Sequence, residues 1–405
     1  MMSAWAMQDY GDCDGARAAL EFLLARQRDD GKIMHELTQS AALLDWSKYP
    51  HGYYHADTTP LFLYSAARYL RQTGDRAFLE QYWPQLEKCY RFCLTMADPD
   101  GLLSNEKGGA AAVETGALSG KVRRDVYLQG VWLGGLDGFA QMAGWMNKAP
   151  LRAEAVERLA KGREAIKSWF VPARGIFAFA ELNDGSRYEA NSGWQGFLAA
   201  FGGVDSTMAR RTAASLAGPA LATPWGTRLF ATGSPSYNPL GYNDGSVWPF
   251  VTAQAAMAMF LHGQEASGYR YLHGMAQATG LSGAGFISEY FSGDRFAEGP
   301  RAVPHQLFSS AALIHPLVGG MLGLEPDAMQ NTLRIDARIP CQAGPVRFEN
   351  YRVGQSVVSA EIFPSKPSSV MQFRNTGPIL LIIRGDSPCI DVPPLKPLTP
   401  GQRAE

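Results

Sequence analysis

The chain has 405 residues, of which 46% are hydrophobic and 19% are charged, and its formal net charge is −1. This composition is typical of a globular protein, and a near-neutral charge gives no long-range field to attract nucleic acid or a membrane surface. The apolar runs, such as residues 251–261, are shorter than the roughly 20 residues that span a bilayer. We therefore expect one large domain with an appendage and no transmembrane helix.

The first eight residues, MMSAWAMQ, lack the basic start and apolar stretch of a secretory signal. The cysteines are odd in number, scattered and without a CxxC pair, which predicts reduced thiols in a cytoplasmic protein. They are Cys13, Cys89, Cys93, Cys341 and Cys389. Because the chain reaches a predicted helix almost at once, a native signal or an upstream domain could have been left off.

Apolar residues recur at spacings of three and four from residue 14 to about residue 322, which predicts a run of helices. The predicted helices cover residues 14–27, 58–73, 77–97, 125–146, 152–170, 192–201, 207–216, 246–263, 265–279 and 306–322. Helices rich in aromatic and small residues alternate with more charged, amphipathic helices. This alternation predicts an inner ring of helices buried on both sides and an outer ring that faces water.

After Gly323 the pattern changes to short runs of alternating and β-branched residues separated by Pro and Gly, which predicts strands and turns. The predicted strands lie within residues 331–339, 346–362, 369–376 and 379–384. We therefore divide the chain into a helical catalytic domain, residues 1–325, and a small C-terminal antiparallel β appendage, residues 326–405. The Pro-rich end, from residue 390, is expected to fray.

Four connections between the predicted helices are unusually long, and long loops in a compact domain are usually functional. They cover residues 28–60, 98–124, 218–245 and 281–305. In a closed ring of helix pairs these loops would gather at one end. They are rich in Trp, Tyr, His, Asp and Glu, a mixture that suits a sugar because aromatic faces stack on C–H surfaces while carboxylates bind hydroxyls. The sequence therefore predicts a carbohydrate site.

Four segments resemble, in their order along the chain, the bacterial amylo-α-1,6-glucosidase family of glycogen-debranching type. The segments are 31-GKIMHE-36, 53-YYHADTTPLFLYSAARYLRQTGD-75, 237-YNPLGYNDGSVWPF-250 and the run 287–327 that begins ISEYFSG. The resemblance implies an (α/α)6 toroid of the six-hairpin glycosidase type and hydrolysis of a glycoside without a cofactor. It leaves the sugar open, because related barrels act on different glycosides.

Hydrolysis of a glycosidic bond needs an acid for the leaving oxygen and a base or nucleophile on the other face of the sugar. The resemblance implies inversion and a glutamate base in the last long loop, which by position is Glu289. It places the acid in the second long loop, but the Trp-Lys-Asp-Ser-like context of the family is absent there, and Glu114 is the best substitute. For Asp125 we favour the role of a helix N-cap, and a role as a ligand of the substrate is the second interpretation.

Asp57 precedes a predicted helix, so an N-cap and a hydroxyl-binding carboxylate are about equally plausible, and the resemblance favours the sugar. The other predicted pocket residues are His35, Glu36, Trp194, Gln195, Tyr242, Asn243, Trp248 and His305. For the stretch 237–250 the alternative is that its aromatic residues simply plug the end of the barrel.

Other chemistries lack their signatures, because the sequence contains no GxxxxGK[ST], HExxH or GxSxG motif. The seven histidines do not cluster at ligand spacing; 51-HGYYH-55 is the closest approach and reads as a loop pair rather than a metal site. The sequence therefore predicts no metal and no cofactor.

An (α/α)6 toroid has twelve helices, whereas the sequence predicts ten, so the family's first helices are either missing or reduced to residues 1–10. An incomplete ring would expose apolar surface, which favours a homo-oligomer. Three hypotheses remain. The first is an exo-acting, inverting hydrolase that removes a terminal α-linked glucose-type sugar from an oligosaccharide. The second is a carbohydrate-binding or catalytically vestigial barrel. The third is a structural helical toroid related to prenyltransferases and terpene cyclases, against which the polar loops argue.

Overall fold

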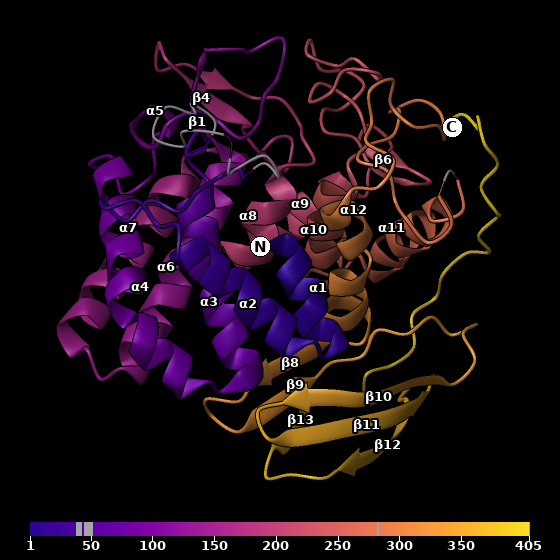
Figure 1. The fold of residues 1–405 in the computed structure, drawn as a ribbon. Helices are drawn as coiled ribbons and strands as arrows, with labels where there is room; N and C mark the ends of the chain where they lie inside the picture. Colours follow the sequence, from indigo (N-terminus) through magenta and orange to yellow (C-terminus); the bar gives the residue numbers. More distant parts are fainter. Residues whose placement is uncertain (38–42, 44–51, 282, 405) are drawn as a thin grey trace.

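The computed structural model describes residues 1–37, 43, 52–281 and 283–404. Among these residues the protein is mostly helical with several small sheets, as the sequence predicts (Figure 1). None of the described helices is long and apolar enough to cross a membrane. The α-helices are α1 (Met2–Tyr10), α2 (Cys13–Leu24), α3 (Thr58–Thr73), α4 (Arg76–Met96), α5 (Asn105–Gly108), α6 (Val126–Trp145), α7 (Ala149–Lys167), α8 (Gln195–Phe201), α9 (Ser206–Leu216), α10 (Pro249–Leu261), α11 (Glu265–Ala278) and α12 (Leu307–Ala311).

Six helices pack on one another in sequence: α1 on α3, α3 on α6, α6 on α8, α8 on α10, α10 on α12, and α12 back on α1. The helices between them along the chain, α2, α4, α7, α9 and α11, each pack against one or two of these six. Helices α6 and α10 are buried on nearly all sides, whereas α4 and α7 expose a polar face. The helices thus alternate between buried and half-exposed along the chain.

Glycines on α6 allow its close packing against both of its neighbours. A Cβ atom on Gly135 would lie 2.5 Å from the carbonyl oxygen of Pro60 in α3. On Gly130 it would lie 2.7 Å from the backbone nitrogen of Leu198 in α8. Real Cβ contacts are not that short, so these positions require Gly, and the small residues in this predicted helix reflect close helix packing.

Helix α1 is an addition to the predicted set of helices. Its Trp5 is 1% exposed, donates from Nε1 to the Ser65 hydroxyl at 2.9 Å, and packs edge-on against Tyr64 and Phe201. The helix is short and lacks both a side-chain N-cap and an amphipathic pattern, because its neighbours bury most of its faces. Periodicity and capping signals therefore could not reveal it.

A buried charged group joins α1 to two other parts of the helical domain. The Asp9 carboxylate pairs with the Arg68 guanidinium of α3, and its other oxygen lies 3.4 Å from Nδ1 of His315. Burial, and then the charge of Arg68, lower the pKa of His315, so this imidazole is neutral near pH 7. The ion pair is therefore between Asp9 and Arg68, with the imidazole as a neutral neighbour.

The predicted helix 306–322 is interrupted. It consists of α12, a turn, and the π-helix η2 (Pro316–Met321). Pro316 has no backbone N–H to donate and its ring crowds the preceding turn, which explains why a regular α-helix does not continue through it.

The C-terminal strands form two small sheets, with one departure from the predicted antiparallel arrangement. The strands are β8 (Leu324–Asp327), β9 (Thr332–Ile335), β10 (Val346–Val353), β11 (Ser356–Phe363), β12 (Val370–Asn375) and β13 (Leu380–Ile383). Strands β10, β11 and β12 are an antiparallel meander, whereas β13 pairs in parallel with β9 in the sheet β13-β9-β8. In the sequence, the three strands of the meander lie between β9 and β13. In the structure, β13 runs along β9 in the same direction.

Three further small sheets lie in the helical part and were not predicted, because their strands are two to four residues long. They comprise β1 (Val122–Asp125) with β4 (Ala180–Leu182) and β5 (Arg187–Tyr188); β2 (Phe170–Val171) with β3 (Ile176–Phe177); and β6 (Ala222–Thr223) with β7 (Gly226–Thr227).

The prediction that all cysteines are reduced is wrong for one pair, because Cys341 and Cys389 form a disulfide. The pairing follows from the tertiary fold: the Cys341 N–H donates to the carbonyl of Ile390 at 2.9 Å, so the two segments lie side by side. The two cysteines are 48 residues apart in the sequence, and this spacing does not indicate a contact. The free thiols are those of Cys13, Cys89 and Cys93.

The Pro-rich C-terminal segment is also held in place rather than frayed. It runs from the β sheets past α11 to the loops at the opposite end (Figure 1). There Phe296 N–H donates to the Gln402 carbonyl at 2.6 Å, and Gly401 N–H donates to the Phe296 carbonyl at 2.8 Å. These bonds tie the C-terminal segment to the loop 281–305.

We predict that Asp9→Asn lowers the free energy of unfolding by about 3 kcal/mol, because it leaves the Arg68 charge buried and unpaired. Urea unfolding followed by circular dichroism measures the change. Asp29→Asn, which removes an exposed carboxylate, is the matched control and is expected to change stability by less than about 0.5 kcal/mol. Equal effects of the two substitutions would contradict a structural role for the ion pair.

Candidate active site

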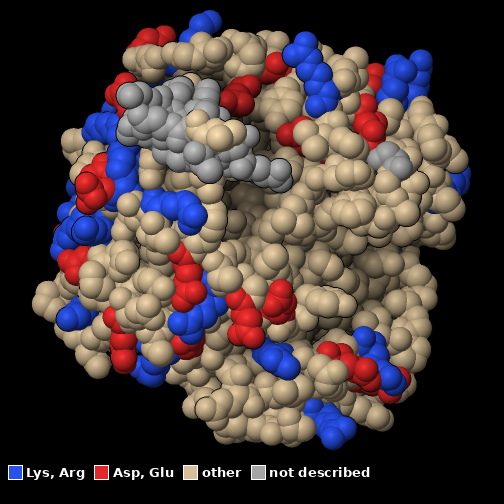
Figure 2. Space-filling model, viewed as in Figure 1, with Lys and Arg blue, Asp and Glu red and all other residues tan. Residues whose placement is uncertain are grey.

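All four long loops contribute to one cavity of about 640 Å³. It also borders the start of α1, and the face seen in Figure 2 is hollowed near its centre, where Figure 1 marks the N-terminus. The predicted site residues that line this cavity are His35, Glu36, Asp57, Glu114, Trp194, Tyr242, Asn243, Trp248 and Glu289. The fold therefore brings most of the predicted residues together from distant parts of the sequence.

Glu289 is a buried carboxylate fixed by two hydrogen bonds. Its side chain is largely enclosed, with the residue 6% exposed. The Tyr242 hydroxyl donates to Oε1 at 2.6 Å, and the Val303 N–H donates to Oε2 at 3.2 Å. Burial and the bond to Glu289 raise the pKa of the Tyr242 hydroxyl, so it remains a proton donor to this carboxylate.

Glu114 has a different environment. Its side chain is 53% exposed, and Oε1 lies 3.4 Å from Nε2 of His55. The loop that carries it is held across the cavity mouth by a bond from the Gly116 N–H to the Asp244 carboxylate at 3.0 Å. One glutamate of the cavity is thus enclosed and fixed, whereas the other is accessible to solvent.

Asp57 does not cap α3, although it stands at the N-cap position. Its Oδ2 accepts a hydrogen bond from the Tyr127 hydroxyl at 2.6 Å, and its buried Oδ1 has no hydrogen-bond partner within the described part of the protein. The same holds for Nε1 of Trp194 and Nε2 of His55, since the contact of His55 with Glu114 lacks hydrogen-bond geometry. Buried polar atoms are rarely left unpaired, so these three atoms are suited to a polar ligand.

The segment 237–250 supplies an aromatic wall. Trp248 donates from Nε1 to the Tyr242 carbonyl at 2.7 Å, and the Tyr242 ring stands edge-on to Trp248 with centroids 4.7 Å apart. The Phe308 ring lies nearly parallel to Trp248 at 6.3 Å. Asn243 is buried beside this wall. Flat apolar faces next to amide and carboxylate groups are the surface that a sugar ring requires.

The two histidines of the cavity are in contact. The rings of His35 and His55 have centroids 4.0 Å apart. Burial, and then the neighbouring His55, lower the pKa of His35, so its imidazole is neutral near pH 7. This side chain therefore contributes hydrogen-bonding capacity to the cavity rather than positive charge.

Lys32 ties together the two loops that carry Asp57 and Glu114. Its buried Nζ donates to the backbone carbonyls of Tyr53 and Gly108. Burial, and then the charge of Arg28, lower the pKa of this ammonium to about 8. Its donors are directed to the backbone, so it fixes the two loops relative to one another.

Three predicted site residues lie outside the lining of this cavity. Asp125 is the N-cap of α6, where it accepts bonds from the Leu128 N–H and from Nδ2 of Asn105, each at 2.8 Å. Gln195 accepts a bond from the Phe177 N–H at 3.1 Å, and His305 is exposed. The capping interpretation of Asp125 is therefore confirmed, while its role as a ligand is not supported.

The sequence interpretation missed Tyr127, His55 and Lys32. Tyr127 stands two residues after Asp125, in a helix whose aromatic residues look like ordinary core. His55 was considered only as a loop residue, and Lys32 gave no signal because a lysine is rarely buried. No group of three or more His, Cys, Asp or Glu residues suited to a metal occurs among the described residues.

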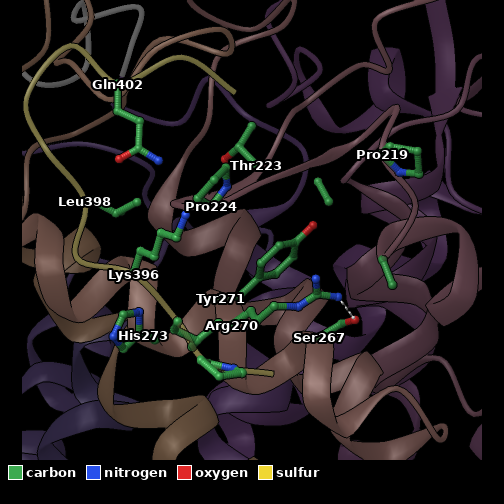
Figure 3. Close-up of a pocket in the computed structure, with 14 residues that line it drawn as sticks. Pro219, Thr223, Pro224, Ser267, Arg270, Tyr271, His273, Lys396, Leu398 and Gln402 are labelled. Carbon is green, nitrogen blue, oxygen red and sulfur yellow. Dashed lines mark hydrogen bonds between the residues drawn. The ribbon is translucent and has the colours of Figure 1, made fainter. Parts of the chain in front are cut away.

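Another cavity, of about 570 Å³, lies between α11 and the C-terminal segment (Figure 3). Tyr271, Arg270 and Lys396 line it, and no carboxylate does so among the described residues. Among the described residues it lacks the pair of carboxylates that hydrolysis of a glycosidic bond uses, so the cavity at the loop end is the candidate active site.

The family model of the mannosylglycerate hydrolase MGH1-like glycoside hydrolase domain matches residues 1–297. The chain belongs to this glycoside hydrolase family. The match supports a glycoside hydrolase of the six-hairpin type and does not single out the amylo-α-1,6-glucosidase subtype. No curated protein matches the chain at a significant level.

Solved structures with a similar fold include an uncharacterized conserved protein from Thermus thermophilus, with a TM-score of 0.62, 15% identity and coverage of 78% of this chain and 91% of that one. The GH63 mannosylglycerate hydrolase of the same organism, in complex with Tris, gives a TM-score of 0.59 at 15% identity and the same coverage. A GH78 family rhamnosidase of Bacillus sp. GL1 gives 0.57 at 16% identity, with coverage of 84% of this chain and 34% of that one. At such identities the likeness is one of fold.

Asp125 gives a prediction for the pH dependence of stability. Burial raises the pKa of its carboxyl to about 6, above the usual 3.8, so the folded protein holds this proton more tightly than the unfolded chain. Its contribution to stability is therefore complete below about pH 4 and is lost as the pH rises through 6. Relative to Asp125→Asn, the wild type should lose about 2 kcal/mol between these values. Parallel pH dependences of the two proteins in urea unfolding would contradict the assignment.

Proposed function

We propose that the protein is an inverting glycoside hydrolase in which Glu114 is the general acid and Glu289 is the general base. One observation carries the proposal: a single cavity is lined by both glutamates, by an aromatic wall and by three buried polar atoms that have no hydrogen-bond partner among the described residues. The membership of the chain in a glycoside hydrolase family supports the same chemistry. No cofactor is required for it.

The contrast between the two glutamates suits their proposed roles. Protonated Glu114 gives its proton to the glycosidic oxygen as the bond from that oxygen to the anomeric carbon breaks. Glu289 takes a proton from a water molecule whose oxygen attacks the anomeric carbon from the opposite face. The products are a sugar of inverted configuration and an alcohol, and the proton that Glu289 gained returns to Glu114 through solvent, to which Glu114 is open.

The buried groups opposite the aromatic wall are proposed to bind the sugar that is released. The unpaired oxygen of Asp57 accepts a bond from a hydroxyl, and the indole N–H of Trp194 donates one. A structure of the Thermus mannosylglycerate hydrolase is in complex with glucose, which supports a terminal glucose-type sugar here. We also propose exo action, which the lining of the cavity by the first residues of the chain, Met1 to Ser3, supports.

We also propose that the inner and outer helices form an (α/α)6 toroid in which α1 is the first inner helix. The closed packing order from α1 through α12 and back supports this arrangement. Residues 1–325 would then be the catalytic domain and residues 326–405 the appendage.

A carbohydrate-binding or vestigial barrel is the second candidate function. The exposure of Glu114 favours it, because no described residue holds this carboxylate in a fixed orientation toward a glycosidic oxygen. Both candidate functions predict that sugars bind in the cavity, and only the hydrolase predicts that a glycosidic bond is cleaved.

We predict that Glu114→Gln and Glu289→Gln impair different steps. Glu289→Gln should lower kcat at least about 100-fold on every substrate. Glu114→Gln should do so on alkyl glycosides and oligosaccharides, yet retain activity on aryl glycosides whose leaving group needs no proton. Release of sugar is followed by NMR, which also reports the anomer formed first.

Glu80→Gln, on the exposed side of α4, is the control and should behave as the wild type. Retention of configuration would refute the inverting mechanism. Binding of sugars without turnover by the wild type would favour the vestigial barrel, and equal losses of Glu114→Gln on both substrate classes would remove Glu114 as the acid.

A further inference from the structure

A second cavity adjoins the candidate active site. It has a volume of about 550 Å³ and is formed mainly by the loop of residues 105–122. Tyr54 and Glu114 line both cavities, so these two side chains stand at their boundary. The two spaces are therefore parts of one site that meet at the proposed acid.

The position of an acid defines which part of a substrate lies on each side of it. The glycosidic oxygen that receives the proton joins the sugar to its leaving group, so it must lie at the acid. The released sugar occupies the aromatic cavity beside Glu289. The leaving group then occupies the second cavity, beyond Glu114.

The second cavity is built for a small hydroxylated group. Three glycines and two alanines line it, together with the polar side chains of Asn105, Thr115, Ser119 and Asn183. Its larger apolar side chains are those of Tyr54, Val113, Leu118 and Val122. Such a surface suits a polyol or a second sugar rather than a bulky apolar group.

The charge of the whole site is negative. Glu106 and Glu114 line the second cavity, and Asp57 and Glu289 line the first. Among the described residues no Lys or Arg lines either cavity. The His35 imidazole is held neutral by its lowered pKa. The nearby Lys32 ammonium donates to the backbone carbonyls of Tyr53 and Gly108. An anionic group in the second cavity would therefore meet like charges, and no Lys or Arg among the described lining residues would balance it.

We propose that the leaving group is a neutral, polyhydroxylated alcohol rather than a carboxylate such as glycerate. The inference rests on the proposed function, because it takes Glu114 as the acid at the boundary. The proposal gives this chain a different class of substrate from the one in the name of the mannosylglycerate hydrolase.

The test compares substrates that share a sugar and differ only in the charge of the leaving group. They are α-glucosylglycerol and α-glucosylglycerate, together with the corresponding α-mannosides. We expect kcat/KM to be at least about tenfold higher for the glycerol compounds at pH 7. Equal values, or a preference for the glycerate compounds, would overturn the inference.

Glu106→Gln provides a charge test within the second cavity. Removal of one negative charge should narrow the preference for glycerol by raising kcat/KM for the glycerate compound, whereas Glu80→Gln should leave the preference unchanged. An unaltered preference in Glu106→Gln would count against an electrostatic origin.

Failure of the proposed function is distinguishable from failure of this inference. If neither compound is cleaved, the hydrolase assignment fails, and binding of the same compounds to the wild type, measured by saturation-transfer NMR, decides the inference alone. Tighter binding of the glycerol compound supports it. Equal binding, tighter binding of the glycerate compound, or binding of neither overturns it.

Discussion

The ion pair between Asp9 and Arg68 is the constraint on which the arrangement of the helices depends. It joins the first helix, α1, to α3, while Trp5 fills the space between α3 and α8. Helix α1 contacts both α3 and α12, so it links an early helix of the chain to a late one. Separating a buried pair of charges costs free energy. This cost favours one position for α1, which has no side-chain N-cap to fix where it begins.

The cavity at the loop end depends in turn on bonds between loops rather than on regular structure. Lys32 joins the first two loops through backbone carbonyls, the Gly116 N–H reaches the third loop at Asp244, and Tyr242 of the third loop binds Glu289 of the fourth. Each bond fixes one carboxylate of the site relative to another. The packed helices therefore supply the base of the cavity, and hydrogen bonds between the loops set the positions of the side chains that line it.

The two glutamates show how environment assigns roles to identical side chains. Glu289 is enclosed and held by two donors, as a base that acts on one bound water should be. Glu114 remains open, as an acid that must regain its proton from solvent should be. Glu114 also lines both cavities, and in our proposal the charge of the neighbouring side chains selects the leaving group there.

The sequence by itself determined the helical class, the later strands, the long loops and nine of the residues that line the cavity, because periodicity, β-branched runs and loop composition are local properties. Tertiary structure alone decided the remainder. Helix α1 was invisible because it is enclosed on most sides, and the Cys341–Cys389 disulfide depends on two segments that only the fold brings together. The Tyr127 hydroxyl binds one oxygen of Asp57, while the other has no hydrogen-bond partner among the described residues. The buried Lys32 is tolerated because two backbone carbonyls accept its hydrogen bonds. Such partners are far apart in the chain, so no local pattern could have indicated them.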